Sequence, residues 1–293
     1  MSAPLDLAIN QATTRPQWSL AEAIEGYARA GIRGIGIWPD KLAECGLAAA
    51  RRRLDASGLK VSSYCAGEMA VDRAGKPQSL ERNRRLVDEA AALQAECLVC
   101  VTGGLPAGSR DLGDARKRAR DALGALLPHA RAAGVPLAIE PIHPMRAADV
   151  SCINTLAQAT DLCVELGQGT GVAVDAYHVW WDPALGVELK RAGERILSFQ
   201  ICDWLAETAA IANDRGMMGD GVIDLAKLHT MARSAGFRGT CEVELMSERN
   251  WWRRDPGEVV ATCIEWFRSL LDTSASRAQE SNSVGRKSTV AGT

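Results

Sequence analysis

One unit recurs along this sequence and constrains its fold more than any other feature: a short apolar run, a turn and an amphipathic helical stretch. Each apolar run is a predicted strand, and the eight runs are Leu5–Asn10, Gly34–Trp38, Val61–Tyr64, Cys97–Val101, Leu137–Glu140, Val172–Asp175, Leu197–Ile201 and Thr240–Leu245. Because parallel strands need crossover connections, strands that alternate with helices indicate a parallel sheet. Eight units predict an α/β fold, a single-domain (β/α)₈ TIM barrel over residues 1–272, with an open doubly wound sheet as the alternative.

The ends of the predicted helices can be read from local signals. Ser19 and Glu22 have the spacing of a capping box, and Gly31 suits the end of the helix that they start. A long helical pattern runs from Asp114 to Ala133 before a glycine and a proline. The segment Thr273–Thr293 is rich in Ser, Ala and Gly with scattered charge, so we expect a disordered C-terminal tail there.

Charge and cysteine usage exclude several classes of protein. The formal net charge is -2, so no basic excess is present to bind a nucleic-acid backbone. The nine cysteines are an odd, scattered set without a disulfide framework, which favours a reducing compartment, and the lone pair Cys97 and Cys100 is expected in the core. We see neither a signal peptide nor an apolar stretch of the ~18 residues that a membrane span needs. A cytoplasmic protein without a membrane or nucleic-acid partner is the expectation.

Alternation within the last four predicted strands favours the barrel. In the strand that ends at Glu140, Leu137 and Ile139 share one face, whereas Ala138 and Glu140 share the other. The next three strands repeat this pattern, so large apolar residues would face the helices and small or polar ones the barrel axis. The last inward residue of each strand is polar, and these residues are Glu140, Asp175, Gln200 and Glu244. They would meet at the C-terminal face, where the active sites of such barrels lie.

Four converging oxygen donors, three of them carboxylates, would repel one another in an empty pocket. A divalent cation would remove that repulsion, and all-oxygen ligation suits Mn²⁺ or Mg²⁺ better than structural zinc. Taken singly, each residue could be an ordinary strand end that hydrogen-bonds to a loop. Four donors at matching positions of successive strands favour a metal site.

Five segments carry a resemblance to a known family: AIEPIH at 138–143, VDAYH at 174–178, FQICD at 199–203, RGMMGDG at 215–221 and EVE at 242–244. With them, residues 4–270 resemble the xylose-isomerase-like TIM barrels of the sugar isomerase/epimerase superfamily, which includes ketose 3-epimerases, hydroxypyruvate isomerases and inosose dehydratases. The resemblance implies one divalent metal ion, Mn²⁺ first and Mg²⁺ or Co²⁺ as alternatives. Its ligands would be Glu140, Asp175, Gln200 and Glu244, with Gln200 standing where many members have His.

Substrate contacts are implied for residues near these ligands. In the family, a His three residues after the ligand Asp lies beside the substrate, which corresponds to His178 here. An Arg after the seventh strand, here Arg215, reaches a substrate oxygen and would stabilise negative charge on it. We add His143, in the loop after Glu140, and Trp38, whose position at the end of the second strand puts it in the pocket wall.

The reaction that the resemblance implies is proton abstraction next to a carbonyl, through a metal-stabilised enediolate, with Glu140 and Glu244 as the acid–base pair. A sugar isomerase or epimerase is the first prediction. The alternative is a metal-dependent lyase on a keto-sugar or keto-cyclitol, either inosose dehydratase-like or a keto-glycoside eliminase. A non-catalytic sugar-binding barrel would require a lost ligand, and the chain has only four His for a nuclease-type zinc centre. The expected partner is a small carbohydrate or cyclitol, and the chain could form a homo-oligomer.

Overall fold

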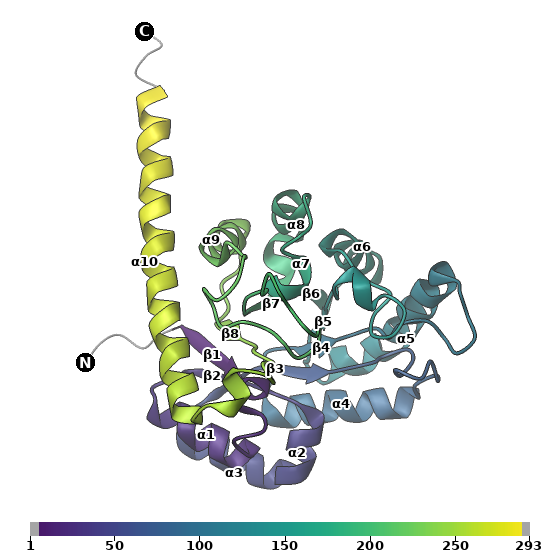
Figure 1. The fold of residues 1–293 in the computed structure, drawn as a ribbon. Helices are drawn as coiled ribbons and strands as arrows, with labels where there is room; N and C mark the ends of the chain where they lie inside the picture. The colour runs from purple at the N-terminus through teal and green to yellow at the C-terminus, as the bar shows by residue number, and fades with distance from the viewer. Residues whose placement is uncertain (1–5, 289–293) are drawn as a thin grey trace.

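The computed structural model describes residues 6–288 and forms a closed barrel of eight parallel strands with helices around it (Figure 1). The strands pair in chain order, and β1 pairs with β8 to close the barrel. They are β1 (Leu7–Asn10), β2 (Gly34–Ile37), β3 (Lys60–Ala66), β4 (Leu98–Cys100), β5 (Leu137–Ile139), β6 (Thr170–Asp175), β7 (Ile196–Ile201) and β8 (Cys241–Val243). All eight predicted strands and the predicted barrel are confirmed, and the open sheet is excluded.

Helices cover the outside of the barrel (Figure 1). The main ones are α1 (Leu20–Arg29), α3 (Leu47–Ser57), α4 (Leu80–Leu93), α5 (Leu112–Ala132), α6 (Leu156–Leu166), α8 (Leu185–Ala192), α9 (Leu225–Ala235) and α10 (Pro256–Ser288). Shorter helices are α2 (Pro39–Cys45) and α7 (Ala176–Val179), and four 3₁₀ turns are η1 (Gln11–Thr14), η2 (Pro144–Arg146), η3 (Gly193–Arg195) and η4 (Trp251–Arg253). None of the helices in residues 6–288 combines the length and the apolar character that a bilayer-spanning segment needs.

The predicted helix ends agree with the structure to within two residues at the positions tested. The Ser19 side chain accepts from the Glu22 backbone N–H, and the Glu22 carboxylate accepts from the Ser19 N–H, so the capping box is confirmed. The helix expected from Asp114 starts earlier, at Leu112, because Asp111 accepts hydrogen bonds from the first turn and caps it.

The segment predicted as a disordered tail, 273–293, lies mostly within α10, which runs to Ser288. The last five residues lie outside the described part of the chain.

The later strands separate a large apolar face from a small one. Leu137, Ile139 and Phe199 belong to the main core between the barrel and the helices. Ala138 and Ala173 belong to a second, smaller cluster inside the barrel, together with Cys65, Cys97 and Val99. The predicted alternation is therefore confirmed in the last four strands except at Leu197, which packs against the interior cluster where the register between β6 and β7 shifts. Small side chains inside the barrel leave room at its C-terminal end.

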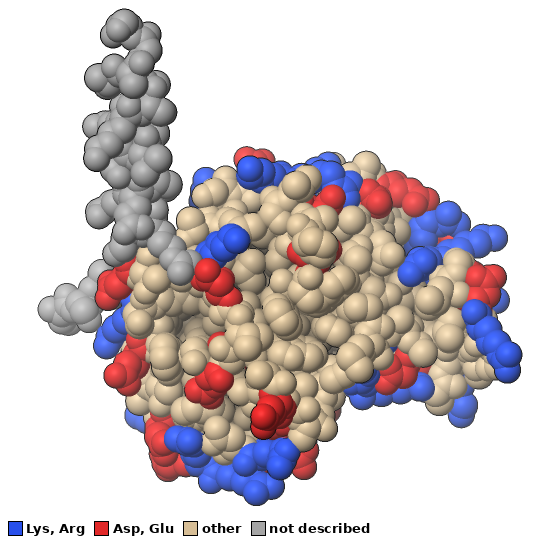
Figure 2. All heavy atoms as spheres, turned by 45° about the horizontal axis from the view of Figure 1, so that its top comes forward, with Lys and Arg blue, Asp and Glu red and all other residues tan. Residues whose placement is uncertain are grey.

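A cavity of about 590 Å³ opens at that end. Its wall includes Trp38, Ile142 and Met246, and its polar lining includes Glu140 and Glu244. On the face of the molecule in Figure 2, acidic and basic side chains are interspersed around a largely uncharged centre. This distribution agrees with the near-neutral net charge.

Candidate functional site

The four predicted ligands come together at the C-terminal end of the barrel. Asp175 ends β6, and it is the register partner of Gln200 in β7. Glu140 and Glu244 follow β5 and β8 directly, and their backbone N–H groups continue the barrel hydrogen bonding to Cys100 O and Ile201 O. All four side chains are buried. Successive parallel strands thus deliver one donor each to the same rim, as their spacing predicts.

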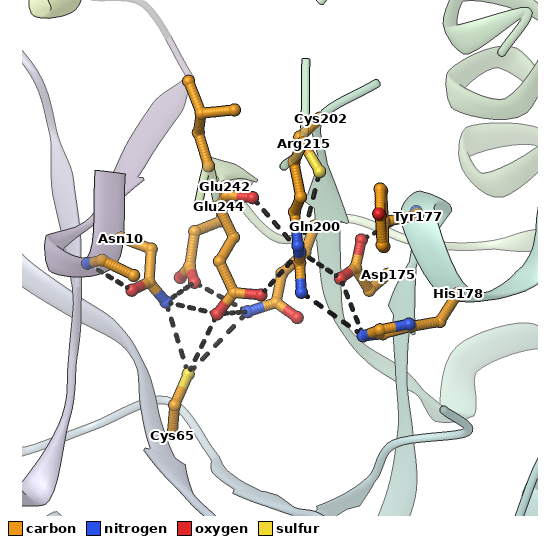
Figure 3. A network of polar contacts seen from close by, with 12 residues as sticks. Asn10, Cys65, Asp175, Tyr177, His178, Gln200, Cys202, Arg215, Glu242 and Glu244 are labelled. Carbon is orange, nitrogen blue, oxygen red and sulfur yellow. Dashed lines mark hydrogen bonds and ion pairs between the residues drawn. The ribbon is translucent and has the colours of Figure 1, made fainter. Parts of the chain in front are cut away.

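Arg215 lies among these ligands, a contact that the sequence does not predict. Its Nη1 donates to Asp175 Oδ2 at 2.9 Å and to Glu244 Oε2 at 3.3 Å (Figure 3). The guanidinium also lies 4.4 Å from the centroid of the Tyr177 ring. A buried guanidinium needs charge partners of this kind, because an unpaired charge in the interior is strongly destabilising. The site therefore holds one fixed positive charge from the protein itself.

His178 is the second predicted substrate residue, and it is buried beside Asp175. Its Nε2 lies 3.6 Å from Asp175 Oδ2 and 3.4 Å from an Arg215 nitrogen, while its Nδ1 accepts from the His143 N–H at 3.4 Å. Burial, and then the Arg215 charge, hold the pKa of His178 well below its usual value, which favours the neutral imidazole. Ligand atoms of Glu140, Asp175 and His178 all lie within 4.8 Å of one another. His178 could therefore contact either a metal ion or a substrate.

The three carboxylates are placed where they cannot all carry charge easily. Burial raises the pKa of Glu140 well above its usual range, and the negative charges of Glu244 and Asp175 raise it further. Burial also raises the pKa of Glu244 to about 8, although Arg215 opposes this shift. One guanidinium does not offset this crowding. The donor set therefore suits a further cation.

Gln200 gives an independent test of whether a metal ion fits. Its Nε2 donates to Glu242 Oε1 at 2.9 Å and lies 3.4 Å from Glu244 Oε1. Its Oε1 is buried and has no hydrogen-bond partner among the described residues. In Figure 3 this oxygen lies on the side of Asp175, His178 and Arg215. A buried amide oxygen without a partner, at the same rim as three buried carboxylates, belongs to a donor set that a hard divalent cation would satisfy.

The other two predicted substrate residues have different surroundings. Trp38 lines the cavity, and its Nε1 donates to Asn10 Oδ1 at 2.8 Å. His143 is half-buried and its ring stacks on Trp204 with 4.9 Å between centroids. His143 caps the 3₁₀ turn η2, where its Nδ1 accepts from the Met145 N–H at 3.3 Å. Its role in substrate binding stays a prediction.

Sequence reasoning missed Glu242, which lies in the barrel interior next to the site. It is 1% exposed, and it accepts hydrogen bonds from Asn10, Ser62, Ser63 and Gln200. The signal was present, because Glu242 shares the inward face of its strand with Glu244, two residues later. Asn10 likewise ends β1 at the same rim.

Comparisons with known proteins agree with this geometry. A family model described as xylose isomerase-like TIM barrel matches residues 24–270. Protein SMc04130 from Sinorhizobium meliloti 1021 is 51% identical, with a TM-score of 0.87 over 90% of this chain and 98% of that one. No curated protein matches this sequence.

More distant structures share the fold. One is the IolI protein with a bound zinc atom, at 20% identity and a TM-score of 0.75 over 92% of this chain and 98% of that one. Another is 3-keto-D-glucoside 4-epimerase, YcjR, from E. coli, at 19% identity and a TM-score of 0.71 over 90% and 99%. The family match spans most of the barrel, with the predicted ligands inside it, and the chain therefore belongs to the xylose isomerase-like TIM barrel family.

Proposed function

We propose that this chain is a divalent-metal-dependent sugar isomerase or epimerase that removes a proton next to a carbonyl. The observation that carries the proposal is the buried, unpartnered Gln200 Oε1 at the same barrel rim as the buried carboxylates of Glu140, Asp175 and Glu244. Glu140 and Glu244 line a cavity of about 590 Å³ there. Family membership supports the same reaction class, and fold neighbours are named as sugar epimerases. A small carbohydrate or cyclitol is the proposed substrate.

Glu140, Asp175, Gln200 and Glu244 would hold the metal ion. We propose Mn²⁺, with Mg²⁺ and Co²⁺ as alternatives, because all four donors are oxygens. When bound, the ion would supply Lewis-acid polarisation of a substrate carbonyl. A fold neighbour that binds zinc supports the presence of a divalent ion without deciding which one.

Glu140 and Glu244 are the proposed acid–base pair. They follow strands three positions apart in the barrel, and both line the cavity, so each can reach a substrate held between them. One carboxylate would take the proton and the other would return one. Arg215 and His178 line the same cavity and would bind substrate oxygens, because a guanidinium and a neutral imidazole both donate hydrogen bonds. Trp38 would pack against the substrate.

A metal-dependent lyase acting on a keto-sugar or keto-cyclitol is the second candidate. Gln200 favours it, because the dehydratase-like members of the family that the sequence resembles also have Gln at this position. We also propose a cytoplasmic location, since all nine cysteines are free thiols, which suits a reducing compartment.

Incubation of the Mn²⁺-loaded protein with a panel of ketoses in deuterated buffer tests the proposal. Deuterium at a substrate carbon without loss of water supports an isomerase or epimerase, whereas loss of water or of an aglycone supports the lyase. Parallel reactions with a chelator, and with Glu244→Gln, separate turnover by this site from background exchange. Absence of exchange and of elimination across the panel would contradict the proposal.

A further inference from the structure

Both carboxylate oxygens of Glu242 accept hydrogen bonds inside the barrel, beside the predicted metal ligands. Its Oε1 accepts from Asn10 Nδ2 at 2.8 Å, Gln200 Nε2 at 2.9 Å and Ser63 Oγ at 2.9 Å. Its Oε2 accepts from Ser62 Oγ at 2.5 Å and Ser63 Oγ at 2.8 Å. The donors come from β1, β3 and β7, so four strands, including β8, meet at one carboxylate.

The neighbouring backbone of β2 leaves room for these hydrogen bonds. A Cβ added to Gly36 would lie 2.6 Å from Glu242 Oε1 and 2.5 Å from Asn10 Nδ2. Only glycine leaves room at this point of β2 for the hydrogen bond between those two side chains. The Asn10 amide is itself oriented, since its Oδ1 accepts from Trp38 Nε1 at 2.8 Å and from the Ala12 N–H at 3.0 Å.

Gln200 is the one predicted ligand whose orientation must be fixed by a neighbouring side chain. A side-chain amide has two ends of nearly equal shape and opposite polarity, so rotation by half a turn exchanges its oxygen with its NH₂ group. The oxygen end would coordinate a cation, whereas the NH₂ end would repel it. Gln200 must therefore be held in one of its two orientations.

We propose that Glu242 is a positioning residue that fixes the Gln200 amide, so that Oε1 and not Nε2 is presented to the metal ion. This inference rests on the metal site of the proposed function. In the flipped orientation the Gln200 oxygen would lie against Glu242 Oε1, and two acceptors would face each other where a hydrogen bond of 2.9 Å now lies. Glu242 thus acts through Gln200 and does not touch the substrate.

Calorimetric Mn²⁺ titration of four proteins tests this role: wild type, Glu242→Met, Gln200→Ala and the double variant. Residues that orient metal ligands typically change metal affinity by about 10–100-fold, and we expect a loss in this range for Glu242→Met. If Glu242 acts through Gln200, the double variant should bind Mn²⁺ no more weakly than Gln200→Ala. Costs that multiply in the double variant, or an unchanged affinity in Glu242→Met, would overturn the inference.

Two controls keep the result interpretable. Glu242→Gln retains one oxygen that can accept from the amides of Asn10 and Gln200, so it should lose less Mn²⁺ affinity than Glu242→Met. It also serves as the second variant should Glu242→Met fold poorly. Glu89→Gln removes a carboxylate from α4, where it accepts from Tyr64, and should leave the affinity unchanged. A wild type that binds no Mn²⁺ would overturn this inference together with the proposed metal site. If the double variant binds Mn²⁺ as expected but the wild type turns over no sugar, only the proposed reaction is overturned.

Discussion

Glu242 and Glu244 are two buried carboxylates on the same inward face, two residues apart. They share the Asn10 and Gln200 amides as hydrogen-bond donors, but their other contacts differ. Glu242 is enclosed by hydroxyl and amide donors and is not among the described residues that line the cavity. Glu244 lines the cavity, contacts the Arg215 guanidinium, and has a pKa raised to about 8 by burial. One pleat of a strand separates the two environments.

The difference shows how a barrel divides its interior. Below the rim, side chains from four strands approach closely enough to satisfy one carboxylate completely, which makes that group rigid. At the rim the strands end, and Glu244 accepts from the Asn10 and Gln200 amides and from Arg215 but from no hydroxyl group of the described residues. Unlike Glu242, it also lines the cavity. We therefore expect chemistry from Glu244 and support from Glu242. The predictions below test this division.

The largest expected effect is on turnover in Glu244→Gln. An amide cannot accept the substrate proton and removes a negative charge from the metal site, and general acid–base groups typically contribute about 10²–10⁴-fold in rate. Glu140→Gln should lose a similar factor. Steady-state kinetics and deuterium exchange would measure both. Gln200→His should keep measurable activity, because an imidazole can still bind the metal. Activity within about threefold of wild type in either Glu variant would exclude that residue as the acid or base.

Metal binding should stabilise the fold. A ligand that binds only the native state at 100 times its Kd adds about 2.7 kcal/mol to the free energy of unfolding. Thermal melts with and without Mn²⁺ should therefore differ by several degrees in wild type. Asp175→Asn should lose most of this increase, since it removes the charge of one ligand. An equal Mn²⁺-induced shift in that variant would show that the ion binds elsewhere.

Arg215→Ala comes next. The loss of a charge-assisted hydrogen bond to substrate is typically worth about 1.5–3 kcal/mol, or roughly 10–150-fold in kcat/KM. From the sequence alone, metal affinity would be unchanged. The contacts of Arg215 with Asp175 and Glu244 now predict tighter Mn²⁺ binding in the variant, because the guanidinium no longer shares their oxygens. Arg85→Ala, on the outer helix α4, is the matched control. An unchanged kcat/KM in Arg215→Ala would show that Arg215 binds the carboxylates and not the substrate.

Much of the fold could be predicted from the sequence because its signals are local. Each strand is a short apolar run, and alternation within the later strands decides which residues face the barrel axis. The same alternation identified Glu140, Asp175, Gln200 and Glu244, since a strand end fixes both the position and the direction of its last side chain.

The rest depends on contacts between segments far apart in the chain. Glu242 accepts hydrogen bonds from Asn10, Ser62, Ser63 and Gln200, and no local sequence pattern predicts that these four donors meet. The orientation of an amide depends on its neighbours and leaves no trace in the sequence. Arg215 extends from a loop, whose path into the site is set by packing and not by periodicity.

The smallest effect is expected outside the barrel, where His229 of α9 is buried with too few partners. Its Nδ1 has no hydrogen-bond partner among residues 6–273, and burial, followed by the charge of Arg233, lowers its pKa to about 4 from the usual 6.5. Between these two pH values the unfolded chain binds a proton that the folded chain excludes, so stability falls as the pH falls. Below pH 4 both the folded and the unfolded chain bind this proton, so the stability that neutral His229 contributes at pH 7 is fully lost. Urea unfolding at pH 7 and pH 4.5 should show a loss about 2 kcal/mol larger in wild type than in His229→Met. An equal pH dependence in both proteins would mean that the pKa of His229 in the folded protein is not lowered.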